Sequence, residues 1–190
     1  MRRLLLILCL LLPALAATAE PRSYRLDPAG SEVRFGYAVG GVPGEGVMPV
    51  KSARMAIDFA RLERSKAEVV LDVPRIRASS QMITDALKGE SMLHAAAYPE
   101  IRFVSSKVSG SVRDGATISG MVTIRGVTRP LALKAQLYRP PDSAEGDLSR
   151  LTVLLTGTIN RHDFGADGYG ELVSGRVDLR IRAQLAETGG

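Results

Sequence analysis

Residues 177–185 read VDLRIRAQL, a segment in which apolar Val177, Leu179, Ile181 and Leu185 alternate with polar residues. Successive side chains of a β-strand point to opposite faces, so a period of two places one face on an apolar interior and the other in water. This segment is the clearest secondary-structure signal of the chain, and it predicts a half-buried strand.

The same alternation recurs along the sequence. It is present in residues 33–39, 69–73, 118–125, 131–137 and 151–159. Eight or so strands, each with one apolar face, can form either a sandwich or a closed barrel. We expect a barrel, because the strand order is meander-like and because a barrel of about eight strands leaves an interior that can hold one small ligand. The predicted fold class is therefore all-β.

Short turn signals separate the predicted strands. Asp114-Gly115 is expected to form a two-residue hairpin turn, because both residue types tolerate a positive φ. Further turn candidates are Gly40-Gly41, Pro43-Gly44 and Gly126, and the last of these, with Thr128 and Pro130, is interpreted as a hairpin rather than as a ligand contact. Such short links favour antiparallel neighbours, since a parallel crossover needs about a dozen residues.

One segment has helical spacing. Between Ser80 and Lys88, apolar residues recur at Met82, Ile83, Ala86 and Leu87, with Ser79 or Ser80 as the N-cap and Gly89 after the last turn. A second short turn is expected at residues 91–97, before Pro99. The sequence therefore predicts one short helical insertion, which we expect to cap one mouth of the barrel.

The first nineteen residues have the pattern of an export signal. Arg2 and Arg3 precede the apolar run Leu4–Leu12, and Ala17-Thr18-Ala19 supplies the small residues that a signal peptidase recognises. The run is shorter than the ~20 residues that cross a bilayer, so we expect no stable membrane anchor. The sequence thus predicts a signal peptide at residues 1–19, a single domain at residues 20–190 and a periplasmic location.

Composition excludes several classes of function. The only cysteine, Cys9, lies in the predicted signal, so we expect neither a disulfide nor thiol chemistry in the mature domain. The formal net charge is +5, and the basic residues are scattered rather than gathered in a stripe with aromatic residues. A nucleic-acid partner is therefore not expected.

The polar residues near position 160 are the most enzyme-like cluster. We interpret Asn160, Arg161, Asp163 and Gly165 as a turn with capping side chains and an adjacent ion pair, with headgroup contact as the second interpretation and catalysis as the third. His94 and His162 lack the spacing of a metal motif, and no GxSxG elbow is present. We therefore expect no catalytic residue, no metal and no cofactor.

Four segments together resemble the YceI-like family of periplasmic lipocalin-like proteins. They are YRLDPAGSEVRF at 24–35, DALKGESMLHAAAYPEIRF at 85–103, TIRGVTRP at 123–130 and INRHDFG at 159–165. The resemblance implies an extended antiparallel lipocalin-like β-barrel whose lumen binds a polyisoprenoid or quinone-like lipid. Where the family commonly has a histidine and a phenylalanine-rich segment, this chain reads GYAVGGVPGEGVMPV, which implies a smaller or more aliphatic lining.

These observations define a candidate site and its alternatives. The expected ligand-binding residues are Phe35, Tyr37, Met82, Leu87, Met92, Phe103, Leu133, Leu155, Asn160 and Phe164. The leading hypothesis is a periplasmic binding protein that carries or sequesters an isoprenoid-type lipid. The alternatives are an exported enzyme that acts on a lipid-like substrate through the Arg161/Asp163 region, and a structural stress-related protein without a specific ligand. The sequence leaves open whether the protein forms a homodimer.

Overall fold

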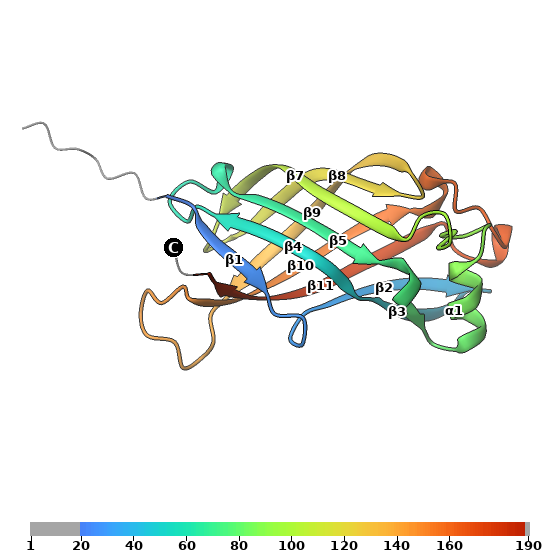
Figure 1. Cartoon of the computed structure of the whole chain (residues 1–190), viewed down its shortest axis with the longest axis horizontal. Helices are drawn as coiled ribbons and strands as arrows, with labels where there is room; N and C mark the ends of the chain where they lie inside the picture. The colour runs from blue at the N-terminus through green and yellow to red at the C-terminus, as the bar shows by residue number, and fades with distance from the viewer. Residues whose placement is uncertain (1–19, 189–190) are drawn as a thin grey trace, which may run out of the picture.

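Antiparallel strands dominate the fold and close into an elongated barrel (Figure 1). The computed structural model describes residues 20–188. The predicted signal peptide at residues 1–19 lies outside the described residues. Among the residues that are described, no helix is long and apolar enough to cross a membrane.

Eight strands form the closed ring, in the order β1-β4-β5-β7-β8-β9-β10-β11, with β11 pairing back to β1. Their bounds are β1 Arg22–Leu26, β4 Val50–Ile57, β5 Lys66–Asp72, β7 Glu100–Ser111, β8 Gly115–Ile124, β9 Val127–Tyr138, β10 Arg150–Asn160 and β11 Arg176–Glu187. All the pairings between them are antiparallel. The predicted all-β antiparallel barrel is confirmed.

Three further strands lengthen the wall of this barrel. They are β2 Glu32–Val39, β3 Val42–Met48 and β6 Arg77–Ala78. Strand β2 continues β1 along the same partner, since β11 pairs with β1 at Leu185 and with β2 at Leu179. Residues 27–31 bulge out between β1 and β2, opposite Gln184. Because β3 and β6 extend β4 and β5 in the same way, the strand order is the expected meander.

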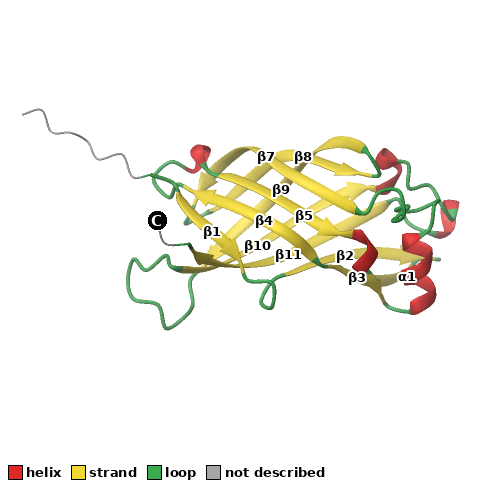
Figure 2. Cartoon of the chain, in the orientation of Figure 1, coloured by secondary structure: helices red, strands yellow, loops and turns green. Residues whose placement is uncertain are grey.

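The two ends of the barrel differ (Figures 1 and 2). One end, called the helix end here, carries α1 Gln81–Lys88, residues 89–99, the β2–β3 turn and residues 161–175. The opposite end, called the termini end, carries the start of β1, the end of β11, the 3₁₀ helix η1 Leu62–Arg64 and the loop 139–149. A cluster of Tyr24, Leu151, Ala183 and Leu185 fills the barrel near the termini end.

Helix α1 forms where the sequence predicts it. The Ser80 hydroxyl accepts a hydrogen bond from the Ile83 N–H, which satisfies one of the free donors of the first turn. The helix ends at Gly89. Residues 91–97 form turns but no second helix. The helical insertion is therefore confirmed as a single helix of two turns.

The turns agree with the sequence in part. Gly40 and Gly41 form the β2–β3 turn with φ of 56° and 80°, and Gly126 forms the β8–β9 turn together with Arg125. The predicted two-residue turn at Asp114-Gly115 is wrong, because residues 112–114 form a three-residue loop in which Ser111 bonds Asp114. Pro43-Gly44 is not a turn either, because both residues belong to β3 and pair with residues of β2.

Candidate functional site

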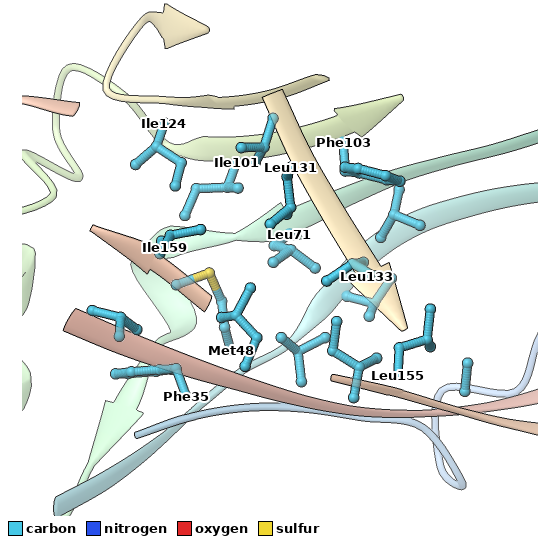
Figure 3. A pocket seen from close by; sticks show the side chains of 18 of the residues that line it. Phe35, Met48, Leu71, Ile101, Phe103, Ile124, Leu131, Leu133, Leu155 and Ile159 are labelled. Atoms are coloured by element: carbon cyan, nitrogen blue, oxygen red, sulfur yellow. The ribbon is translucent and has the colours of Figure 1, made fainter. Parts of the chain in front are cut away.

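A cavity of about 820 Å³ runs through the barrel lumen. Such a volume is within the range of ligand pockets, roughly 300–1,000 Å³. Its wall is apolar, and side chains from strands all around the barrel point toward one another across it (Figure 3). The side chains labelled there are Phe35, Met48, Leu71, Ile101, Phe103, Ile124, Leu131, Leu133, Leu155 and Ile159.

Large side chains of the lumen lie against glycines on neighbouring strands. Phe35 pairs with Gly46 and Tyr37 pairs with Gly44 between β2 and β3, and an added Cβ at either glycine would overlap the aromatic ring. The ring of Phe103 overlaps the Cβ position of Gly120 in the same manner. These side chains therefore lie along the wall rather than across the lumen, which leaves the interior open.

The structure brings most of the predicted site residues to this cavity. Its lining includes Phe35, Tyr37, Met82, Leu87, Met92, Phe103, Leu133, Leu155 and Phe164. Contrary to expectation, Asn160 lies outside it: the side chain is exposed and accepts a hydrogen bond from the His162 N–H, which caps the 3₁₀ helix η3 Arg161–Phe164. The physical reason is the strand period, because the preceding residue, Ile159, points into the lumen.

Several lining residues were absent from the sequence-based list. Met48, Ile101, Ile124 and Leu131 are all less than one tenth exposed and belong to the central hydrophobic cluster. Ile124 and Leu131 lie in strands with clear alternation, so the period of two was a sufficient signal for them. Ile101 lies in β7, where the adjacent apolar residues Phe103 and Val104 interrupt the alternation. Met48 belongs to the glycine-rich β3, where alternation is weak.

Helix α1 closes part of the wall at the helix end. Ile83, Ala86 and Leu87 line the cavity from one face of the helix. Met92 follows on the next segment and is 5% exposed, whereas Met82 lines the cavity although it is 81% exposed. The helix therefore contributes both to the interior and to the rim of the lumen.

Arg161 is buried beside the lumen without a carboxylate partner among the described residues. Its guanidinium donates to five backbone carbonyls, those of Ala166, Gly168, Gly170, Val173 and Ser174. A guanidinium has five N–H donors, so this ring of carbonyls satisfies all of them. Arg161 therefore holds the 166–174 loop in place and has no donor left for a substrate.

The remaining polar residues near the site are exposed or paired elsewhere. Asp163 is exposed, and no ion pair joins it to Arg161 in the described part of the chain, so the predicted pair is wrong. The ion pair of this segment joins His162 Nδ1 to Asp167 Oδ1 at 2.6 Å. His94 packs edge-on against Tyr98. Within residues 20–188, no three His, Cys, Asp or Glu side chains gather into a metal site.

Perturbed pKa values occur outside the lumen. Burial, reinforced by the charge of Glu187, raises the pKa of Tyr24, whose hydroxyl donates to the Leu148 carbonyl near the termini end. On the outer surface, the hydrogen bond from Arg176 lowers the pKa of Asp178. Neither group reaches the cavity, so these shifts describe local contacts rather than an acid–base pair at the site.

Comparison with known proteins places this barrel in a family. A model described as the YceI-like domain matches residues 24–185. The chain belongs to the YceI-like family. A relative is the UPF0312 protein of Pseudomonas savastanoi pv. phaseolicola, which is 31% identical over 126 residues. This alignment spans 66% of the present chain and 65% of that relative's length.

Two solved structures have the same fold. BcnA of Burkholderia cenocepacia matches with a TM-score of 0.72 at 23% identity, over 84% of this chain and 98% of that one. A polyisoprenoid binding domain from Saccharophagus degradans matches with a TM-score of 0.62 at 14% identity, over 88% of this chain and 99% of that one. At these identities, the likeness shows a shared fold.

Proposed function

We propose that this YceI-like protein is an exported carrier that holds a polyisoprenoid-type lipid in its barrel lumen. The observation that carries the proposal is the apolar cavity of about 820 Å³, whose wall is built from aliphatic and aromatic side chains along the barrel. The Saccharophagus degradans domain with the same fold is described as polyisoprenoid binding, which supports an isoprenoid as the ligand class. The periplasmic location rests on the export signal predicted at residues 1–19.

Burial of the lipid tail dominates the expected binding energy. Each CH₂ moved from water into an apolar site contributes about 0.8 kcal/mol, so twenty buried carbons contribute on the order of 16 kcal/mol before ordering costs. A single hydrogen bond to a headgroup contributes about 1 kcal/mol. The proposal therefore covers polyprenols and quinone-like lipids alike, because both present an isoprenoid tail to the same wall.

The enzyme alternative has little support from the geometry. An acid or base must reach the reacting atom of a bound substrate. Asp163 is exposed and does not line the cavity, and the donors of Arg161 are all occupied by backbone carbonyls. We therefore propose binding without turnover.

Mass spectrometry of the purified protein tests the proposal. Native spectra of protein expressed from the full-length sequence should show one lipid per chain, and organic extracts should contain a polyisoprenoid. Protein that is stripped of lipid in denaturant and refolded should take up a polyprenol or ubiquinone, but not a polar solute of similar mass. A chain that emerges empty and takes up neither lipid after refolding would contradict the carrier proposal.

A further inference from the structure

Exposed apolar side chains gather at the helix end of the barrel. Val42 is 69% exposed, Met82 81%, Tyr169 52% and Leu172 56%. They come from the start of β3, from α1 and from the segment around the 3₁₀ helix η4 Gly170–Leu172. The β2–β3 turn contacts η4 directly, since the Gly40 N–H donates to the Leu172 carbonyl at 2.7 Å. We call Val42, Met82, Tyr169 and Leu172 the apolar rim.

The apolar rim is continuous with the lumen. Met82, Tyr169 and Leu172 are exposed to solvent and also line the cavity. Tyr169 adopts a φ of 65°, a conformation that residues with side chains rarely adopt, while its side chain stays half exposed. An apolar path therefore leads from the interior of the barrel to its surface at this end.

A basic pocket lies on the other face of α1. It has a volume of about 320 Å³ and is lined by Pro49, Arg75, Ile76, Arg77, Gln81, Thr84 and Lys88. None of its three cations pairs with a carboxylate in the described part of the chain. Ile76 is 1% exposed and lines both cavities, so it separates the basic pocket from the lumen.

The charges at the helix end are unevenly distributed. The 161–175 segment carries the exposed carboxylates Asp163, Asp167 and Glu171. The cations Arg75, Arg77 and Lys88 flank α1, together with the exposed carboxylates of Asp85, which accepts a hydrogen bond from Gln81, and Glu90. The α1 side therefore combines three cations with two carboxylates, whereas the 161–175 segment has three exposed carboxylates and no exposed Lys or Arg. An anionic surface would be attracted more by the α1 side, next to Met82 of the apolar rim.

We propose that the helix end docks onto an anionic lipid bilayer, with the apolar rim in the interface and the basic pocket on lipid phosphates. Amphipathic surfaces that combine exposed apolar residues with cations bind such membranes. An acidic protein partner would satisfy the cations but gives no reason for the rim to continue into the lumen. The inference rests on the proposed function, because it identifies the bilayer as the source or destination of the carried lipid.

Vesicle co-sedimentation tests the docking. The probes are vesicles of phosphatidylcholine alone and vesicles of phosphatidylcholine mixed with phosphatidylglycerol. Protein expressed from the full sequence should sediment with the mixed vesicles, more weakly as salt rises, and much less with phosphatidylcholine alone. The triple variant Arg75→Gln, Arg77→Gln, Lys88→Gln should bind the mixed vesicles on the order of a hundredfold more weakly, at about fivefold per cation.

A charge-matched triple variant provides the control. Three exposed arginines serve for this control: Arg25 pairs with Ala186 near the end of β11, Arg64 is the last residue of η1, and Arg113 lies in the β7–β8 loop. Changing them to glutamine removes the same charge from elements that do not contact α1. This control should bind the mixed vesicles within about twofold of the wild type, since screening confines the attraction to the docked face. Equal binding by both triple variants, or wild-type binding that ignores phosphatidylglycerol or salt, would overturn the proposal.

The apolar rim has its own test. The double variant Val42→Ser, Leu172→Ser should also lose vesicle binding, whereas the outer-wall variant Val104→Ser, Met121→Ser should not.

Lipid content measured on the same preparations separates this inference from the proposed function. A protein that carries lipid but ignores vesicles refutes the docking alone, and one that binds vesicles but carries no lipid refutes the carrier alone. An acidic protein that protects the basic pocket, without vesicle binding, would also overturn the docking proposal.

Discussion

The ring of Phe35 in β2 occupies the space that a side chain at Gly46 of β3 would need. The two residues are direct cross-strand partners on the inner face of the barrel. Glycine at this position lets the ring lie along the wall, and Tyr37 has the same relationship with Gly44. The glycine-rich sequence of β3 therefore has a packing role: it widens the lumen beside two aromatic rings.

Gly46→Ala should consequently destabilise the protein and reduce lipid retention. The new methyl group forces the Phe35 ring toward the cavity, and overpacking of this kind costs about 1–3 kcal/mol. Urea unfolding and lipid extraction measure the two effects, and adding Phe35→Leu should restore stability. The control is Gly36→Ala, because a Cβ there would lie 3.8 Å from the Asp178 Cβ, in ordinary contact. Equal unfolding midpoints for the two single variants would show that the overlap is unimportant.

Strand positions could be predicted from the sequence because alternation is a local signal. The last strand, in which Leu179 and Ile181 point inward, could be identified from its own residues without knowledge of the strands that pair with it. The contact between Phe35 and Gly46 was not, since it depends on the β2–β3 register. The two-residue turn at Gly40-Gly41 sets that register. The sequence predicted a second turn at Pro43-Gly44 as well, which the structure does not contain.

The positions of the polar side chains near residue 160 could be predicted only in part from the local sequence. Counting from Ile159 with a period of two would have placed Asn160 outside the lumen, but its position within the polar INRHDFG motif suggested a headgroup contact instead. The environment of Arg161 could not be predicted, because its five partners are backbone carbonyls spread over residues 166–174. Every residue has a backbone carbonyl, so no residue type in the sequence identifies the carbonyls that accept hydrogen bonds from Arg161.

Phe103→Asp should abolish lipid retention. Phe103 lines the lumen, and a carboxylate in an apolar cavity is strongly disfavoured. The matched control is Val104→Asp, on the same strand and 41% exposed on the outer wall. Lipid per folded chain, measured by extraction and circular dichroism, should fall only for Phe103→Asp. The milder Phe103→Asn gives the same comparison if the aspartate variant does not fold. Full lipid retention by a folded Phe103→Asn protein would refute the assignment of Phe103.

Arg161→Lys should destabilise the helix end despite keeping the charge. An ammonium has three donors, so at least two of the five carbonyls lose their partner, at about 1–3 kcal/mol for each buried group. The expected result is a lower urea midpoint and faster hydrogen exchange in residues 166–174. Arg129→Lys is the control, because Arg129 is exposed and bonds only the neighbouring Thr128 carbonyl at 3.4 Å. Parallel unfolding of the two variants would argue against the carbonyl ring.

The mature N-terminus should be Glu20. The small residues Ala17 and Ala19 direct cleavage after Ala19. Intact mass of protein from the periplasmic fraction of a Gram-negative host measures this directly. Ala19→Arg should block processing, because a large charged residue does not suit the peptidase, and Glu20→Gln should not. Periplasmic protein that retains residues 1–19 would rule out the predicted cleavage.

Asp163→Asn distinguishes a carrier from an enzyme. A general base contributes about 10²- to 10⁴-fold to a reaction rate, so an enzyme that used Asp163 would lose activity by this factor. Because Asp163 is exposed and does not line the cavity, we expect the variant to bind apolar lipid within about tenfold of the wild type, a difference of ~1.4 kcal/mol. His162→Ala should also bind apolar lipid within about tenfold of the wild type, since it removes only the surface pair with Asp167.

Mass spectra of the bound lipid, taken before and after long incubation with the wild-type protein, should be identical. Turnover of that lipid, lost in a folded Asp163→Asn protein, would replace the carrier with an enzyme.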